Sequence, residues 1–437
     1  MKRIVVVFAF ALTGAVLSGA CGDGGEGAPT SSPTATATVS PAASPRASVT
    51  PSASAAATAS ASPATPRSSD AGQIAYLGPD GADIWLANAD GSGKRPLTEG
   101  QCQEAAGPFW SRRGDKIACV SGGTAEAPEA KIAVFDLEGQ TVAQAEQQAW
   151  LGGFAWSADN RHFVYAIAEG ASLETARPSL VIGDTDSEAT VRLEEAQDAR
   201  WSPDGAQLAY LKVAGEELTI YDLASGQARA LGQGLRPLAW ALAGKALLVA
   251  ANFQQREEFG ADYQANLLDL ASGEMTRVPE LDNSTQFWLS RDGQAAAFLA
   301  GPAQRAEGGA TISILDLATG KVTAIEGAVI GYPSEGIPSD HIAFSPDGAY
   351  LYWVDVVSDQ QGLSGTIYRA KSDGSGLTQL GVVEGVLFGF SPDRTMVLFS
   401  DGSTLWVAGV DGSDVRSLVE GVGGRWPPAA WRPLPTP

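Results

Sequence analysis

The pentapeptide Trp201-Ser202-Pro203-Asp204-Gly205 is the clearest copy of an element that recurs along the chain. Proline presets the φ of its turn position, aspartate can bond the backbone ahead, and glycine takes the position with positive φ. The element therefore predicts a reversal between two strands, with the aromatic side chain at the end of the first strand. Successive copies are 39 to 55 residues apart. The other copies begin at Trp110, Trp156, Trp240, Leu289, Phe344, Phe390 and, in truncated form, Trp431.

Three further strands follow each reversal. After Gly205 come a short apolar strand at Gln207–Val213, a third strand at Leu218–Asp222 that ends in an acidic turn, and a weaker fourth strand at Gln227–Leu231. Four short antiparallel strands in each unit of this length are typical of the blade of a β-propeller. The fold class is therefore all-β, and the aromatic residue of each copy is expected to anchor its blade.

The two ends of the repeat region complement each other. Gln73–Tyr76 is a second strand with no first strand before it, whereas Pro428–Pro433 is a first strand with nothing after it. Pairing these fragments builds one blade from both ends and leaves no unpaired edge. We therefore predict about eight four-stranded blades, with seven as the alternative because the Trp240 and Leu289 units are degenerate.

The first twenty residues have the plan of a signal peptide. Lys2 and Arg3 precede the apolar run Ile4–Leu12, which is too short for a membrane span. The following Leu17-Ser18-Gly19-Ala20-Cys21 resembles the bacterial lipobox, although its leucine stands one residue further from the cysteine than usual. We expect lipidation of Cys21; the alternative is an ordinary signal peptide cleaved nearby.

A tether follows over residues 21–71. Of the 39 residues from Ala28 to Pro66, 36 are Ala, Ser, Thr or Pro. Such a segment cannot bury enough apolar surface to offset its ordering entropy, so we expect it to be disordered. We favour a plain spacer over an O-glycosylated stalk. The propeller is then expected over residues 72–433, followed by a short tail over 434–437.

The charge balance restricts the partners. A formal net charge of −21 and a pI of about 4.5 disfavour nucleic acid and anionic lipid headgroups. We expect a monomer that meets the membrane only through its lipid anchor.

The residues offer little catalytic chemistry. The chain contains no Gly-x-Ser-x-Gly nucleophile elbow and has only two histidines. His162 begins a second strand and is expected to be exposed. His341 lies in a first strand, which lines the central channel of a propeller, and is expected to be solvated or hydrogen-bonded. We predict no catalytic residue, no cofactor and no metal ligand. The sequence leaves open a cation in the central channel but identifies no residues that would bind it.

Other polar motifs favour structural roles. The segments Asp90–Gly93, Asp373–Gly376 and Asp411–Asp414 superficially suggest calcium loops but lack the further oxygen ligands and terminal Glu. They are predicted to be turns between third and fourth strands. Cys102 and Cys119 flank one reversal, and export would permit a disulfide between them. The alternative is two free thiols, with Cys119 as a small core residue.

The repeat resembles a known family. Ile74-Ala75-Tyr76, Asp83-Ile84-Trp85, Asp90-Gly91-Ser92-Gly93 and Pro96-Leu97-Thr98, followed by Pro108-Phe109-Trp110-Ser111, are similar to the TolB-type propeller repeat, a relative of the WD-type repeat. The resemblance covers roughly Gly72 to Pro433. The resemblance implies the fold but not one function, because proteins with this repeat include periplasmic interaction proteins, propeller halves of peptidases and surface lipoproteins. TolB itself has fewer blades and a separate N-terminal domain.

We therefore expect an exported lipoprotein whose propeller binds a protein or a glycan. An enzyme of lactonase-like or sugar-modifying type that uses the central channel is the alternative, and a structural or sensory envelope component is a third. Trp85, Trp406 and Tyr221 are expected to pack between blades. Long loops between second and third strands would carry specificity, and they are Thr124–Glu129, Phe253–Asp262, Ala303–Gly309 and Asp359–Gly365. Aromatic residues outside the packing positions are candidate contacts, and they are Trp150, Phe253, Tyr263 and Tyr332.

Overall fold

A computed structural model of the chain describes most of the repeat region. The described ranges are 72–79, 81–102, 106–121, 129–148, 150–170, 176–187, 189–255, 261–283, 287–300, 310–330, 341–359, 362–421 and 429–434. The expected signal peptide, Cys21, the tether and residues 435–437 lie outside them. Among the described residues, no helix has the length and apolar character needed to cross a membrane.

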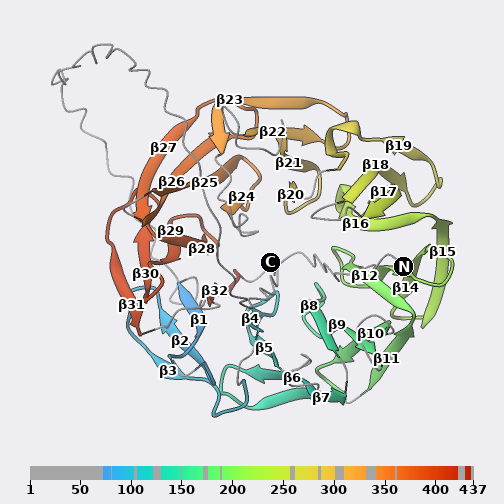
Figure 1. Cartoon of the computed structure of the whole chain (residues 1–437), viewed down its shortest axis with the longest axis horizontal. Coiled ribbons are helices and arrows are strands. Elements are labelled where there is room, and N and C mark those ends of the chain that lie inside the picture. Colours follow the sequence, from blue (N-terminus) through green and yellow to red (C-terminus); the bar gives the residue numbers. More distant parts are fainter. Residues whose placement is uncertain are drawn as a thin grey trace, which may run out of the picture. The chain divides into compact units, whose positions relative to one another are not determined.

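The described strands form eight four-stranded antiparallel sheets arranged in a ring, which is a β-propeller (Figure 1). We number the blades 1 to 8 along the ring. Blade 1 contains β32, β1, β2 and β3, and the remaining blades follow in sequence from β4–β7 to β28–β31. The predicted fold class is confirmed, and eight blades replace the alternative of seven.

Each blade uses its strands in the same order from the channel outward (Figure 1). The innermost strands are β32 (Ala429–Trp431), β4 (Ala106–Trp110), β8 (Trp150–Trp156), β12 (Ala196–Trp201), β16 (Leu235–Ala241), β20 (Phe287–Leu289), β24 (Ile342–Phe344) and β28 (Val386–Phe390). The second strands are β1 (Gln73–Leu77), β5 (Lys116–Ser121), β9 (His162–Glu169), β13 (Gln207–Lys212), β17 (Ala246–Gln255), β21 (Ala295–Ala300), β25 (Tyr350–Asp359) and β29 (Met396–Ser400).

The outer half of each blade is equally regular. The third strands are β2 (Ile84–Asn88), β6 (Glu129–Asp136), β10 (Arg177–Asp184), β14 (Glu217–Asp222), β18 (Ala261–Asp269), β22 (Ala310–Asp316), β26 (Gly362–Lys371) and β30 (Thr404–Gly409). The fourth strands are β3 (Arg95–Pro96), β7 (Thr141–Gln148), β11 (Thr190–Glu194), β15 (Gln227–Gln233), β19 (Met275–Arg277), β23 (Val322–Ile330), β27 (Thr378–Glu384) and β31 (Arg416–Glu420). Two single-turn 3₁₀ helices, η1 (Leu242–Gly244) and η2 (Pro279–Leu281), lie in blade 5 and after it.

The core lies between the blades. Successive residues of a strand point to opposite faces of its sheet. In β13, Leu208 and Tyr210 pack against blade 3, whereas Ala209 packs against blade 5. Both faces are buried, which explains why the second strands are continuous apolar runs. Trp85, Tyr221 and Trp406 also contribute to these joints, as expected.

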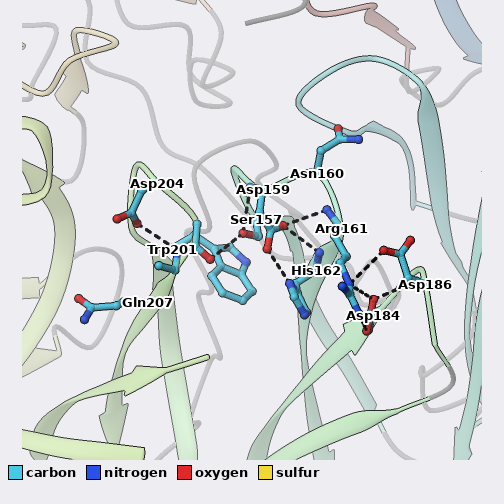
Figure 2. Close-up of polar contacts among 12 residues, drawn as sticks. Ser157, Asp159, Asn160, Arg161, His162, Asp184, Asp186, Trp201, Asp204 and Gln207 are labelled. Carbon is cyan, nitrogen blue, oxygen red and sulfur yellow. Dashed lines mark hydrogen bonds and ion pairs between the residues drawn. The ribbon is translucent and has the colours of Figure 1, made fainter. Parts of the chain in front are cut away.

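The Ser-x-Asp part of the repeat fixes the reversal itself. The buried Ser202 hydroxyl donates to the Asp204 carboxylate at 2.6 Å and accepts the Gln207 backbone N–H at 2.9 Å. The same pair of hydrogen bonds recurs at Ser290, Ser345 and Ser391. Figure 2 shows the reversals of blades 3 and 4, where the Ser157 hydroxyl bonds the Gly205 carbonyl at 3.1 Å. Each reversal therefore also contacts its neighbour.

In five of the eight blades, a repeat tryptophan ties the blade to the preceding one. The Trp156 indole N–H donates to the carbonyl of Phe109, the residue just before the blade 2 tryptophan, at 3.0 Å. Trp110, Trp201, Trp240 and Trp431 make the equivalent bond to Ala430, Ala155, Arg200 and Gly389, at 3.0, 3.2, 2.8 and 3.2 Å. This hydrogen bond, which recurs from blade to blade, explains why tryptophan, an aromatic residue with an N–H donor, recurs at this position.

Phe390 has no such donor, and another side chain replaces it. Arg394 stands where most copies have glycine, with a φ of 59°. Its Nε donates to the Phe344 carbonyl of the preceding blade at 3.1 Å, and its guanidinium lies over the Phe390 ring. The joint between blades 7 and 8 thus keeps a hydrogen bond without a tryptophan.

The chain's two ends close the ring as predicted. β32 pairs with β1 in antiparallel register, with Ile74 opposite Trp431 and Tyr76 opposite Ala429. One apolar cluster then joins blade 8 to blade 1, with Leu398 and Val407 on one side and Ile74 on the other.

Cys102 and Cys119 form a disulfide in the structure. Their Cα atoms are 5.9 Å apart, and both residues are buried in the joint between blades 1 and 2. The bridge closes a loop with a sequence separation of 17 residues, for which chain-entropy arguments give a stabilisation of about 3 kcal/mol.

Two of the four predicted long loops are shorter than expected. β25 and β26 pair as far as Asp359 opposite Gly362, so Asp359–Gly365 is mostly strand. β17 and β18 likewise pair as far as Gln255 opposite Ala261. Polar residues at these strand ends concealed the pairing from a hydropathy pattern. The other two loops lie outside the described residues, apart from Glu129, the first residue of β6.

Candidate functional site

The innermost strands carry a repeated irregularity. A β-bulge interrupts β4, β8, β12, β16 and β28 two or three residues before the aromatic anchor. Bulges re-aim side chains and are frequent beside functional sites. The strands with bulges line the channel, so this region is where we look first.

The bulge of β12 carries charged residues. Asp198 adopts a φ of 57°, and Arg200 follows it two residues later on the same strand. Arg200 Nε donates to the Leu238 carbonyl of blade 5 at 2.7 Å, and Nη1 donates to the Ala199 carbonyl at 2.8 Å. Arg236 of β16 completes the group, with Nη1 3.5 Å from Asp198 Oδ2.

Burial controls the electrostatics of this group. Burial raises the pKa of Asp198, and the nearby charges of Arg200 and Arg236 oppose the rise. Burial also lowers the pKa of Arg200, against the attraction of Asp198. A carboxyl with a raised pKa in a channel is a feature of functional sites as well as of structural ion pairs.

Aromatic rings continue the group outward. The Arg236 guanidinium carbon lies 4.1 Å from the centroid of the Phe253 ring, and that ring stacks on Tyr263 with centroids 6.3 Å apart. Glu216 Oε1 lies 4.0 Å from Arg236 Nη2. We call Asp198, Arg236, Glu216 and Phe253 the loop-end cluster, because they lie at the end of blades 4 and 5 where second strands lead into third strands. Its carboxylates and ring hold a partly exposed guanidinium in place, as a recognition surface requires.

The predicted aromatic contacts are partly corrected. Tyr263 is only 7% exposed, and its burial, with the charge of Asp282, raises its pKa to about 12. It supports Phe253 and is not a surface contact. Phe253 itself is half-buried. The side chain of Trp150 and the whole of Tyr332 lie outside the described residues.

The two histidines are both engaged in the fold. His162 was expected to be exposed but is half-buried, with Nδ1 2.6 Å from Asp159 Oδ2 (Figure 2). His341 is 1% exposed, and its Nε2–H donates to the Leu387 carbonyl of blade 8 at 3.0 Å. Burial lowers the pKa of His341 to about 4, because the charged form would lose its hydration.

The three Asp-Gly segments are turns between third and fourth strands, as predicted. In each, the first aspartate accepts hydrogen bonds from the backbone and hydroxyl of the serine two residues on, as Asp90 does from Ser92 at 2.9 and 2.6 Å. Asp373 and Asp411 do the same. Their oxygens serve the turn. Within the described ranges, no group of three or more His, Cys, Asp or Glu residues is placed to hold a metal ion.

Sequence reasoning missed Asp198, Arg200 and Arg236. The available signal was a pair of charged residues, Asp198 and Arg200, in a segment expected to be an innermost strand. The corresponding stretches of blades 2 and 3 hold Gly107-Pro108 and Gly152-Gly153. The bulge that brings Asp198 and Arg200 to the same cluster is not visible in strand alternation.

Comparison with known proteins supports the fold alone. No protein-family model matches the chain, and no curated protein matches its sequence. Similar solved structures include a eukaryotic initiation factor, with 15% identity, 83% of this chain and 98% of that chain covered, and a TM-score of 0.55. TolB from Acinetobacter baumannii is also among them, with 17% identity, coverage of 67% and 74%, and a TM-score of 0.37. A third is the β-propeller domain of the Trilobed protease from Pyrococcus furiosus, with 16% identity, coverage of 62% and 85%, and a TM-score of 0.42.

The depressed pKa of His341 predicts a loss of stability in acid. The unfolded chain takes up a proton near pH 6.5, whereas the folded chain resists it until about pH 4. Stability contributed by the neutral form is therefore complete above pH 6.5 and falls by about 3 kcal/mol between pH 6.5 and 4. His341→Gln keeps a donor for the Leu387 carbonyl but cannot titrate. We measure the free energy of unfolding in urea at pH 7 and at lower pH for each protein. Between these pH values the free energy of unfolding of His341→Gln should fall by less than that of the wild type, because the residue at 341 no longer titrates.

The control for this measurement is His162→Gln, which removes the chain's other histidine and should retain the full acid loss. Equal pH dependence in the wild type and His341→Gln would contradict the assignment.

Proposed function

We propose that the chain is an exported lipoprotein whose propeller binds a protein or a glycan through the loop end of its channel. The proposal rests on the loop-end cluster, where Arg236 is held by Asp198, Glu216 and the Phe253 ring beside the channel. An aromatic ring and a guanidinium group flanked by carboxylates can provide both apolar contact and hydrogen bonds to a ligand. The inter-blade clusters make the ring a rigid support for them.

Export and anchoring come from the N-terminal sequence. A basic and apolar leader followed by a lipobox-like segment ending at Cys21 favours a diacylglyceryl anchor. The Ala/Ser/Thr/Pro-rich segment after it would extend about 35 Å as a flexible coil, which places a propeller clear of the membrane. A role outside the cytoplasm also agrees with the acidic surface and with the disulfide.

An enzyme remains the second candidate, favoured by the raised pKa of Asp198 on the innermost strand of blade 4. Hydrolysis of a glycosidic bond ordinarily needs two carboxyl groups flanking the bond. Glu216 lies on the far side of Arg236 and is largely exposed. Glycan cleavage that is abolished by Asp198→Asn would favour the enzyme over the binding protein.

Binding should depend on the loop-end cluster. Residues 72–437 are tested for binding on a glycan array and in a pull-down from solubilised envelope proteins. We expect the wild type to bind a ligand in one of these assays, and we expect Arg236→Gln and Phe253→Ala to lose that binding. A central contact residue of this kind typically weakens binding by about thirtyfold or more when truncated.

The matched control is Arg161→Gln. It removes an arginine of blade 3 that pairs with Asp184 at the end of the ring away from the loop-end cluster. It should bind as the wild type does, with circular dichroism verifying that all variants are folded. If Arg236→Gln and Phe253→Ala both bind every ligand as the wild type does, the proposed site is wrong.

The anchor is tested at Cys21. The full chain should fractionate with membranes, and mass spectrometry of its N-terminal peptide should show a diacylglyceryl group on the cysteine. Cys21→Ala should move the protein to the soluble extracytoplasmic fraction. An unmodified Cys21, or a membrane fraction unchanged by the substitution, would contradict the anchor.

A further inference from the structure

The ion pair at the centre of the loop-end cluster is unusually open. Charge-assisted hydrogen bonds between arginine and a carboxylate are usually about 2.7 to 2.9 Å long. Arg277 reaches both carboxylate oxygens of Asp282, at 2.6 and 2.5 Å. Arg236 Nη1, in contrast, stays 3.5 Å from Asp198 Oδ2. Among the described residues, neither Arg236 nor Asp198 has a side-chain hydrogen-bond partner, although their side chains are only 25% and 22% exposed.

The surrounding structure holds both charged groups in place. The Arg236 guanidinium carbon lies 4.1 Å from the centroid of the Phe253 ring. Arg200 ties the strand of Asp198 to the strand of Arg236, because its Nε donates to the Leu238 carbonyl of β16 at 2.7 Å. The donor and the acceptor are therefore positioned before any ligand arrives, which lowers the entropic cost of binding one.

Asp198 also adopts a backbone conformation that costs energy. Its φ of 57° lies in the left-handed region, which residues other than glycine seldom occupy. At the same position, three residues before the tryptophan anchor, blades 2 and 3 have Gly107 and Gly153, both with positive φ. Glycine is thus the unstrained residue for this bulge, and the fold does not require an aspartate there. Strained residues of this kind cluster at binding sites.

The open pair is complementary to two adjacent hydroxyl groups. An ionised aspartate only accepts hydrogen bonds and an arginine only donates them, whereas a hydroxyl group does both. Hydroxyl groups on neighbouring carbons of a sugar ring can therefore donate to Asp198 and accept from Arg236 at the same time. The formal charges of the two side chains cancel, so the pair does not favour an ionic ligand. Protein side chains carry at most one hydroxyl group each.

We propose that Asp198 and Arg236 bind two adjacent hydroxyl groups of an uncharged sugar, which makes the ligand of the loop end a neutral glycan. This inference rests on the proposed function and narrows it, because it selects a glycan over a protein and a neutral glycan over an acidic one. Phe253 is a positioning residue, since it supports the Arg236 guanidinium.

The test uses the full chain with Cys21→Ala, which cannot be lipidated at that residue. The probes are an array of oligosaccharides of glucose, galactose, mannose and N-acetylglucosamine, together with oligosaccharides of glucuronate and galacturonate. We expect a neutral oligosaccharide to bind, with an affinity in calorimetry that changes little between low and high salt, because no net charge is paired on binding. Periodate treatment of that oligosaccharide, which cleaves the bond between carbons that carry adjacent hydroxyl groups, should abolish binding.

Substitutions then test the two residues in the same background. Asp198→Asn and Arg236→Gln should each weaken binding of the oligosaccharide about tenfold or more, because each removes a charged hydrogen-bonding group. Asp198→Gly should lose binding as well and remain folded in thermal unfolding, because glycine relaxes the bulge. The matched control is Asp186→Asn, which changes an aspartate 3.2 Å from Arg161 at the end of the ring away from the loop-end cluster (Figure 2). It should bind as the unsubstituted chain does.

Three results would overturn the inference. One is a neutral oligosaccharide that Asp198→Asn and Arg236→Gln bind unchanged, and another is preferential binding of the uronate oligosaccharides. The third is no binding of any oligosaccharide. If a solubilised envelope protein is then retained and Arg236→Gln loses it, the ligand class is wrong but the proposed function stands. If no protein is retained through Arg236 either, the proposed function fails as well.

Discussion

Each blade of this ring is covered on both faces by its neighbours, so no blade can serve as an end. The pairing of β32 with β1 meets this constraint. It supplies the innermost strand of blade 1, whose Trp431 donates to the Gly389 carbonyl of blade 8, and whose Ala430 carbonyl accepts the Trp110 indole of blade 2. The three residues of β32 thus complete two joints. The disulfide between Cys102 and Cys119 holds one of these joints covalently.

The two ends of the channel have different physical characters. At the turn end, buried serines and their aspartates bond the reversals, and Ser157 and Gly205 join neighbouring turns, so the backbone there is closely specified. At the loop end, bulges and strand ends admit varied side chains, and the loop-end cluster is one result.

Much of the fold could be read from the repeat, because its turn chemistry recurs in order and spacing and because the two terminal fragments are complementary. The joint at Phe390 could not, since Arg394 replaces the tryptophan donor from a position that normally holds glycine. The loop-end cluster was missed for a related reason. Bulges in β12 and β16 break the alternation that assigns side chains to faces, so the contacts of Arg236 with Asp198 and with Phe253 could not be read from the pattern. His162 was misplaced because Asp159, within its own turn, bonds it.

Closure by β32 is the claim on which the site and both proposals depend. The most direct measurement compares the thermal unfolding of residues 72–434 with that of residues 72–421, which lack β32. Closure predicts one cooperative transition for the longer chain, and for the shorter chain a markedly lower unfolding temperature with aggregation through the exposed edge of β1. Unfolding of both chains at the same temperature, with the same cooperativity, would contradict the account.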